Sequence, residues 1–166
     1  MPTTYLHLGS NLGDPRRQLD AARVLLEQRV GRVIAASGYY RTAAWGVTDQ
    51  PDFINQVLVH DTPLAPHVVL RHALAIEQEL GRVRLRRWGE RTIDIDVLYY
   101  DDLVLDTPDL QIPHPRLHLR NFVLVPLREI APAVVHPILQ LDTEQLLIRC
   151  PDDLPATRLP DGDPGD

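Results

Sequence analysis

The chain has 166 residues, 44% of them hydrophobic, which suits one domain with its own core and is short for two. Its longest apolar runs fall well short of the roughly 20 residues that cross a membrane, and its start resembles no secretory signal, so we expect a cytoplasmic protein. The net charge of -6 argues against general nucleic-acid binding, which needs a basic surface. A single cysteine excludes a disulfide within the chain.

Hydrophobic periodicity predicts four strands and two helices, in the order strand, helix, strand, strand, helix, strand. The expected strands cover residues 4–8, 32–42, 53–61 and 92–102, and the expected helices cover residues 15–29 and 64–81. Asp14 suits the N-cap of the first helix and Pro15 its first turn, while Gly81 ends the second helix. This order is that of a ferredoxin-like α+β sandwich, an antiparallel sheet with helices packed on one face.

The remaining segments are less regular. Residues 43–52 are polar and interrupted by glycine and proline, so we expect a loop. Residues 106–120 are punctuated by prolines, and residues 122–130 predict one or two helical turns. We assign residues 1–150 to the domain. Residues 151–166 are rich in proline and aspartate with few large apolar side chains, so we expect them to be disordered or loosely packed on the surface.

All 17 basic residues are arginine. The absence of lysine excludes a P-loop, whose lysine reaches nucleotide phosphates, and it excludes Schiff-base chemistry. Residues 82–91 contain five arginines against Glu90, whereas residues 151–166 contain five aspartates and one arginine. A local anion site can therefore exist within an acidic protein, and arginine would form it.

Asp94 and Asp96 project from one face of the last predicted strand, because successive side chains of a strand alternate between faces. At about 3.3 Å per residue they lie about 6.6 Å apart, close enough to bind one metal ion or two adjacent ones. Carboxylate oxygens are the ligands that magnesium prefers. Ile93, Ile95 and Val97 take the opposite face and are expected in the core. The alternative is that the two aspartates are only the solvated face of the strand, although aspartate is a poor strand former.

The arginine-rich residues 82–91 lie directly before these aspartates in the sequence. Guanidinium groups bind phosphate oxygens bidentately, and magnesium bridges such oxygens to carboxylates, so a magnesium-bound polyphosphate would satisfy both charges. Gly81 and Gly89 suggest a mobile segment that could close over a substrate. The alternative is a solvated charged loop after a helix.

Four groups of motifs, in this order and spacing, resemble the 6-hydroxymethyl-7,8-dihydropterin pyrophosphokinase family. They are GSNLGD, then YYRT with QPDFIN, then GRVR with RWGERTIDID, and finally IPHPR with RNFVLVPLREIAP. The resemblance covers roughly residues 4–137. It implies a ferredoxin-like fold and an enzyme of folate synthesis. Such enzymes transfer a pyrophosphoryl group from ATP to the pterin hydroxymethyl group and release AMP, with two magnesium ions.

The resemblance also implies the site residues, position by position. Asp94 and Asp96 match the magnesium-binding aspartates of the family. Arg82 and Arg91 match the arginines that act on the ATP phosphates. These four residues form the expected catalytic set. The residues that match the nucleotide site, including the tryptophan of the loop that closes over it, are Glu77, Arg84, Trp88, His114 and Arg120. The residues that match the pterin site are Thr42, Ala43, Trp45, Gly46, Phe53, Asn55 and Phe122.

The pterin assignments agree with the chemistry of the side chains. Flat heteroaromatic rings stack on phenylalanine, and Asn55 has both a donor and an acceptor for an edge that has both. From the residues alone, core packing is the commoner explanation for Phe53 and Phe122, and a surface loop position is the commoner explanation for His114. Asn55 within a strand is harder to explain without a role, because a buried amide needs partners.

The sequence departs from the family pattern at two places. Glu90 stands where the family usually has proline, which puts a negative charge and a more flexible backbone before Arg91. Residues 43–45 replace a segment that commonly contains proline. We therefore expect differences in loop closure and in the pterin rim, while neither departure touches the expected metal or phosphate ligands.

Two rival functions are compatible with the same residues. Another magnesium-dependent nucleotidyl or phosphoryl transferase would share the aspartates and arginines but lack a pterin site. A non-catalytic ferredoxin-like module would bind a nucleotide or RNA, although RNA binding needs surface aromatics and a basic face, and the chain has 5% aromatic residues. We expect the partners to be the small molecules ATP and 6-hydroxymethyl-7,8-dihydropterin, with no nucleic acid and no membrane, and the chain to be a monomer.

Overall fold

The computed structural model describes residues 1–44, 49–81 and 92–161. In chain order its elements are β1 (Thr3–Ser10), α1 (Pro15–Arg29), β2 (Val33–Ala36), β3 (Tyr40–Thr42), β4 (Phe53–Asp61), α2 (Pro66–Glu79), β5 (Asp94–Tyr100), β6 (Leu105–Asp106), β7 (Gln111–Ile112), the 3-10 helix η1 (Leu117–Leu119), α3 (Asn121–Ile130), α4 (Thr143–Arg149) and β8 (Ala156–Arg158). Among the described residues, none of the helices combines the length and apolar character that a membrane span requires.

The main sheet is antiparallel, with the strand order β5-β1-β4-β3-β8 and with β2 also paired to β4. The predicted order of strands and helices and the ferredoxin-like fold class are confirmed. The strand expected over residues 32–42 is divided into β2 and β3. Between them the backbone N–H of Ser37 donates to the carbonyl of Val57, but the side-chain oxygen of Ser37 accepts the return hydrogen bond from the N–H of Val57 at 2.9 Å, so a side chain replaces the backbone acceptor at this position.

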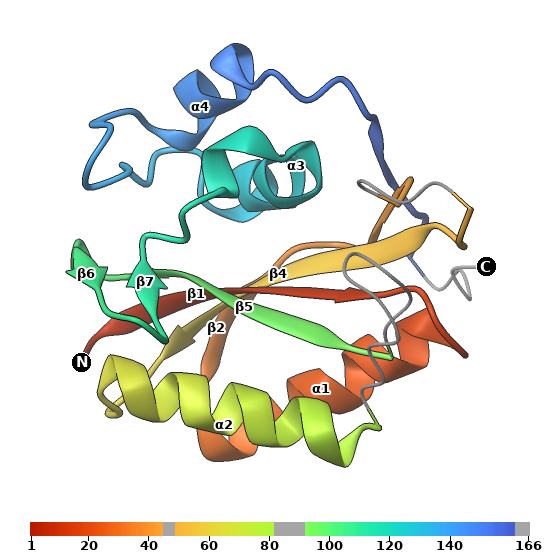
Figure 1. Ribbon diagram of the computed structural model, residues 1–166, viewed down its shortest axis with the longest axis horizontal. Helices are drawn as coiled ribbons and strands as arrows, with labels where there is room; N and C mark the ends of the chain where they lie inside the picture. The colour runs from red at the N-terminus through yellow and green to blue at the C-terminus, as the bar shows by residue number, and fades with distance from the viewer. Residues whose placement is uncertain (45–48, 82–91, 162–166) are drawn as a thin grey trace.

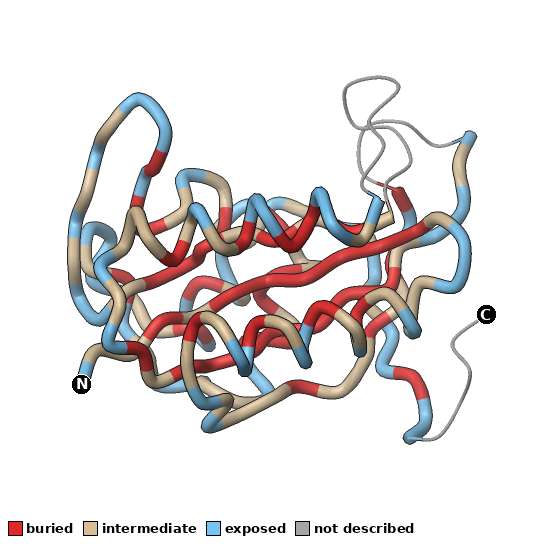
Figure 2. Tube along the Cα trace, turned by 90° about the horizontal axis from the view of Figure 1, so that it is seen from below, coloured by how far each residue is buried: buried red, intermediate tan, exposed pale blue. Residues whose placement is uncertain are grey.

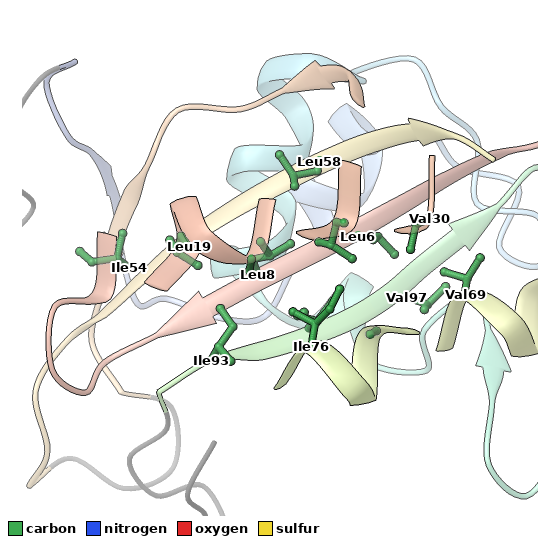
Figure 3. Close-up of a cluster of buried hydrophobic side chains, with 14 of the residues drawn as sticks. Leu6, Leu8, Leu19, Val30, Ile54, Leu58, Val69, Ile76, Ile93 and Val97 are labelled. Atoms are coloured by element: carbon green, nitrogen blue, oxygen red, sulfur yellow. The ribbon is translucent and has the colours of Figure 1, made fainter. Parts of the chain in front are cut away.

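One face of the sheet is covered by α1 and α2, which close the larger hydrophobic cluster (Figure 1). Leu6, Leu8 and Leu58 of the central strands meet the apolar sides of both helices there (Figure 3). The central strands are buried along much of their length (Figure 2). Ile93 and Ile95 belong to this cluster, as predicted, and each fully buried side chain of this size contributes about 1.5–3 kcal/mol to stability.

The opposite face is covered by α3, with α4 beyond it (Figure 1). This layer differs from the expected sandwich with helices on one face only, and α3 has 10 residues where one or two turns were expected. The helix contains Pro126, which removes one internal hydrogen bond. Val123, Leu124 and Leu127 are buried on the sheet, and this burial stabilises the helix despite the proline.

The C-terminal segment differs from the expected loosely packed tail. Strand β8 pairs antiparallel with β3, so that Ala156 lies opposite Thr42 and Arg158 opposite Tyr40. Leu159, which follows, joins the larger hydrophobic cluster. Backbone pairing and the burial of one leucine therefore order residues 156–159, which composition alone did not predict. Residues 162–166 lie outside the described part of the chain.

Candidate active site

A cavity lies between the sheet and the beginning of α3, and it encloses about 540 Å³ including space open to solvent. The residues that line it are His7, Gly9, Thr42, Ala43, Phe53, Asn55, Asp94, Asp96, Arg120 and Phe122. Eight of these ten were predicted as site residues, the exceptions being His7 and Gly9. Four strands and one helix thus bring together side chains that are up to 115 positions apart in the sequence, as between His7 and Phe122.

The floor of this cavity follows from strand register. Gly9 of β1 pairs with Asp94 of β5 on one side and with Asn55 of β4 on the other. A Cβ atom at Gly9 would lie 3.2 Å from the Oδ1 atom of Asn55 and 3.9 Å from the ring of Phe53. The missing side chain therefore leaves a hollow between a carboxylate, an amide and an aromatic ring.

Three buried polar side chains form a hydrogen-bond chain along one wall. The Nδ2 atom of Asn55 donates to the hydroxyl of Thr42 at 2.8 Å, and the Oδ1 atom of Asn55 lies 3.0 Å from the Nε2 atom of His7. Because Oδ1 can only accept, His7 carries its proton on Nε2. An amide can form four hydrogen bonds, so Asn55 retains one donor and one acceptor position for a ligand.

His7 was missed from the sequence, although a polar side chain inside an otherwise apolar strand is the same signal that marked Asn55. Burial lowers the pKa of His7 to about 4, against the opposing effect of the negative charge of Asp94. The ring is therefore neutral near pH 7. Its unprotonated Nδ1 atom lies 3.9 Å from the Oδ2 atom of Asp96 and has no hydrogen-bond partner among the described residues.

Asp94 and Asp96 both line the cavity, as their alternation in the strand predicted. Within residues 1–44, 49–81 and 92–161, no group of three or more His, Cys, Asp or Glu side chains forms a metal site. Two partly exposed carboxylates still fit magnesium, because this ion keeps several waters and takes further ligands from substrate phosphates instead of a complete protein cage. The two carboxylates could therefore contribute ligands to a magnesium ion that also binds phosphate.

A second cavity of about 570 Å³, including open space, lies beside β5 and is walled by α2 and by the segment around β7. The residues that line it are Leu70, Ile95, Asp96, Val97, Pro108, Asp109, Leu110, Gln111, His114 and Pro115. Asp96 lines both cavities, so the two are adjacent at this residue. The apolar walls formed by Leu70 and Leu110 were not predicted, since such residues cannot be told from core residues in the sequence.

Two of the residues predicted for the nucleotide site line different cavities: Arg120 lines the first and His114 the second. The Nε2 atom of His114 is 4.0 Å from the Oδ1 atom of Asp96, and its Nδ1 atom accepts a hydrogen bond from the backbone N–H of Arg116. Burial lowers the pKa of His114, against the charge of Asp96. Arg120 lies in the first cavity, with its guanidinium carbon 5.3 Å from the centre of the Phe122 ring.

Glu77 takes a position that the sequence did not indicate. It is 3% exposed in the last turn of α2, and its Oε2 atom accepts a hydrogen bond from the backbone N–H of Ile95 at 2.7 Å. Ile95 lies between Asp94 and Asp96, so this carboxylate holds the outer edge of β5 at the point where both site aspartates project. The predicted contact of Glu77 with a nucleotide stays a prediction.

Six predicted site residues fall outside the described part of the chain, on residues 45–48 and 82–91. They are Trp45, Gly46, Arg82, Arg84, Trp88 and Arg91. Residues 82–91 connect α2 to β5, and this connection enters the sheet directly before Asp94. The roles of these side chains therefore stay predictions.

The comparison with known sequences decides the family. Residues 5–132 match the 7,8-dihydro-6-hydroxymethylpterin-pyrophosphokinase family. The chain belongs to this family. It is 45% identical over 145 residues to the 2-amino-4-hydroxy-6-hydroxymethyldihydropteridine pyrophosphokinase of Haemophilus influenzae, which covers 87% of the chain and 91% of that protein. It is 50% identical over 136 residues to the protein of the same name from Methylorubrum extorquens, covering 81% of the chain and 86% of the relative.

Solved structures support the fold of this pyrophosphokinase family member. The crystal structure of Plasmodium falciparum HPPK-DHPS with pteroate superposes with a TM-score of 0.74 at 16% sequence identity. The alignment covers 89% of the chain and 42% of the Plasmodium protein, so the chain spans less than half of that larger polypeptide. At this identity the likeness concerns the fold alone, which is the α+β sandwich described above.

Proposed function

We propose that this chain transfers the pyrophosphoryl group of ATP to 6-hydroxymethyl-7,8-dihydropterin, giving the pterin diphosphate and AMP in folate synthesis. The observation that carries this proposal is the position of Asp96, which lines two adjacent cavities with different sets of lining residues. A transferase for two substrates needs two binding sites that converge on the reacting groups. Membership of the family supplies the identity of the two substrates.

The pterin occupies the first cavity in this proposal. Phe53 and Phe122 both line it and would stack on the flat bicycle, as offset aromatic pairs do. The free donor and acceptor positions of Asn55 would pair with the amino and oxo groups at the edge of the pterin. Thr42 orients Asn55 through the hydrogen bond between their side chains. The backbone around Thr42 and Ala43 completes the rim of the site.

ATP occupies the second cavity, where Leu70 and Leu110 provide an apolar surface for the adenine ring. The triphosphate then extends past His114 to Asp96. Asp94 and Asp96 would hold two magnesium ions, whose chemistry is to neutralise the phosphate charge and polarise the group being transferred. Arg120 from the first cavity would supply further positive charge. So would the three arginines that are predicted to bind the phosphates, which are Arg82, Arg84 and Arg91. Trp88 would close over the nucleotide site.

In the reaction the pterin hydroxyl oxygen attacks the β-phosphorus of ATP. A new bond forms between that oxygen and the β-phosphorus, and the bond from the β-phosphorus to the bridging oxygen of AMP breaks. The hydroxyl proton is released, and AMP leaves with the bridging oxygen and its electron pair. Positioning and electrostatic stabilisation account for this step without a dedicated base. The neutral ring of His7 keeps Asn55 oriented and adds no positive charge to the pterin cavity.

The test is product analysis with Mg-ATP and 6-hydroxymethyl-7,8-dihydropterin. AMP formation that depends on both pterin and magnesium is expected, and Asp96→Asn should lower it by at least about a hundredfold, as loss of a charge-stabilising group does. Asp101→Asn is the matched control, because Asp101 follows β5 but lines neither cavity. ADP as the product would indicate an ordinary kinase. Equal turnover with an unrelated alcohol would favour the rival transferase, and nucleotide binding without turnover would favour the binding module.

The expected monomeric state and cytoplasmic location, and the expected absence of nucleic-acid and membrane partners, also belong to this proposal. The small-molecule substrates of the family support the expected absence of nucleic-acid and membrane partners. Light scattering on the purified protein tests the monomeric state directly.

A further inference from the structure

Residues 151–159, which we call the strap, connect two walls of the first cavity. The strap leaves α4, passes the beginning of α3 and ends on the sheet beside β3 (Figure 1). The match to the pyrophosphokinase family ends at residue 132, so the strap lies outside it. None of the site residues predicted from the sequence lies in this segment.

The first end of the strap is bonded to the first residue of α3. The carboxylate of Asp152 accepts a hydrogen bond from the backbone N–H of Asn121 at 2.9 Å. The side-chain amide of Asn121 donates in turn to the backbone carbonyls of Asp152, at 2.7 Å, and Leu154, at 3.1 Å. Asn121 lies between Arg120 and Phe122, which both line the cavity.

Asp152 acts as a helix cap supplied from another part of the chain. The first N–H groups of a helix have no partner within it, and the N-cap residue of α3, Arg120, makes no side-chain capping bond. A carboxylate at this position also interacts favourably with the positive end of the helix dipole. Asp152 therefore bonds to the first turn of α3, which is also held by the burial of Val123 and Leu124, and that turn carries Phe122.

The second end of the strap is bonded to β3. Besides the pairing of β8 with β3, the backbone N–H of Leu159 donates to the carbonyl of Tyr39 at 2.8 Å. Arg158 donates from Nε to the Oε1 atom of Glu129 at 3.2 Å, and the same atom accepts the hydroxyl proton of Tyr40 at 2.6 Å. Glu129 belongs to α3, so this cluster joins the helix to the strand that carries Thr42.

We propose that the strap is a positioning element for the pterin substrate. Asp152 and Arg158 set the distance between the wall that carries Phe122 and the wall that carries Thr42 and Phe53. This inference rests on the proposed function, because it assumes that the pterin binds between these walls. The strap lines neither cavity, and the residues whose positions it would set, Phe122 and Thr42, line the first cavity and not the second.

The experiment measures two dissociation constants by calorimetry. One is for 6-hydroxymethyl-7,8-dihydropterin with saturating magnesium and α,β-methylene-ATP, and the other is for magnesium with α,β-methylene-ATP alone. Asp152→Ala should weaken pterin binding by about fivefold or more, because it removes the partly buried hydrogen bond to the N–H of Asn121. The dissociation constant of the nucleotide should stay within about twofold of that of the unaltered protein. Asp152→Asn keeps one acceptor oxygen and should recover part of the pterin affinity.

Asp142→Ala is the matched control. Asp142 also accepts a backbone N–H at a helix start, that of Gln145 in α4, but it lines neither cavity. This variant should lose stability without a change in pterin affinity, which separates positioning from a merely structural role. If Asp152→Ala does not fold, Arg158→Gln tests the other end of the strap and should shift the pterin constant in the same direction.

Pterin affinity that is equal in the strap variant and the Asp142→Ala control would overturn the inference. So would an equal weakening of pterin and nucleotide binding, since that would indicate a general disturbance. Failure of the proposed function is a distinct result, because the unaltered protein would then bind no pterin or form no AMP, whereas failure of the strap inference leaves both intact.

Discussion

Asn55→Ala tests the site most directly. Asn55 is 1% exposed and joins the hydroxyl of Thr42 to the Nε2–H of His7. Removing the amide leaves both of these buried groups without their partner, and each such loss costs about 1–3 kcal/mol. We therefore expect the free energy of unfolding to fall by about 2–4 kcal/mol once partial relaxation is allowed. The pterin also loses one donor and one acceptor, so its KM should rise by about 10- to 100-fold.

Gln56→Ala is the matched control for this experiment. Gln56 is the next residue of β4, is 2% exposed and donates from its amide to the carbonyl of Ser37 at 2.9 Å. Because neighbouring strand residues point to opposite faces, its side chain is directed away from the cavity. Urea unfolding should show destabilisation of both variants. Steady-state assays of AMP formation should show a higher pterin KM for Asn55→Ala alone, with the ATP KM changed little in either.

A pterin KM equal to that of the unaltered protein in both variants would refute a contact between Asn55 and the substrate. In that case the open positions of Asn55 would not contact the substrate, and the hydrogen-bond chain would serve only the fold. If Asn55→Ala raises the KM for ATP as much as that for pterin, the assignment is equally refuted, because the two cavities would then not be separate sites.

Three further predictions concern other parts of the chain. Glu77→Leu should raise the magnesium concentration for half-maximal activity by several-fold and accelerate amide hydrogen exchange at Ile95. Glu77→Gln keeps an acceptor for this N–H, so both quantities should stay close to those of the unaltered protein. Unchanged exchange at Ile95 in Glu77→Leu would contradict the prediction. Gly9→Ala should raise the pterin KM by about tenfold, since the added methyl group enters the cavity floor 3.2 Å from an amide oxygen, and an unchanged KM would show that the floor is not used. Burial lowers the pKa of His60 in the folded protein, so below about pH 6.5 the unfolded state binds more protons than the folded state. The free energy of unfolding should therefore decrease as the pH is lowered, by at most about 1.4 kcal/mol per pH unit from this group. Urea unfolding between pH 7.5 and 5 should show a flatter dependence in His60→Gln, and an identical dependence would exclude His60 as its source.

Part of the site could be predicted because it depends on local geometry. The alternation of a strand alone places Asp94 and Asp96 on one face and Ile95 on the other, whatever the strand pairs with. The same rule marked Asn55 as a polar side chain that needs partners. His7 obeys this rule too, but its importance depends on register, since only the pairing of β1 with β4 and β5 brings it to Asn55 and Asp96.

Other features required the assembled chain. The second cavity combines Leu70 of α2 with Leu110 beside β7, and neither residue differs in sequence from an ordinary core leucine. The burial of Glu77 against β5 depends on how α2 crosses the sheet. The ordered strap was hidden by its composition, because a polar, proline-rich segment can still pair with a free sheet edge and bury a single leucine.

The amino-acid sequence by itself determined the order of strands and helices over residues 4–102, the faces of the strands and the chemical types available to a phosphate-transfer site. These are consequences of short-range stereochemistry and of composition. Only the tertiary structure decided which of those groups meet: a neutral histidine beside Asp96, a glycine-floored hollow beside Asn55, and two cavities that are both lined by Asp96. The physical reason is that strand register, helix crossing and chain reversal are set by the burial of the whole core, and no local segment of sequence records their outcome.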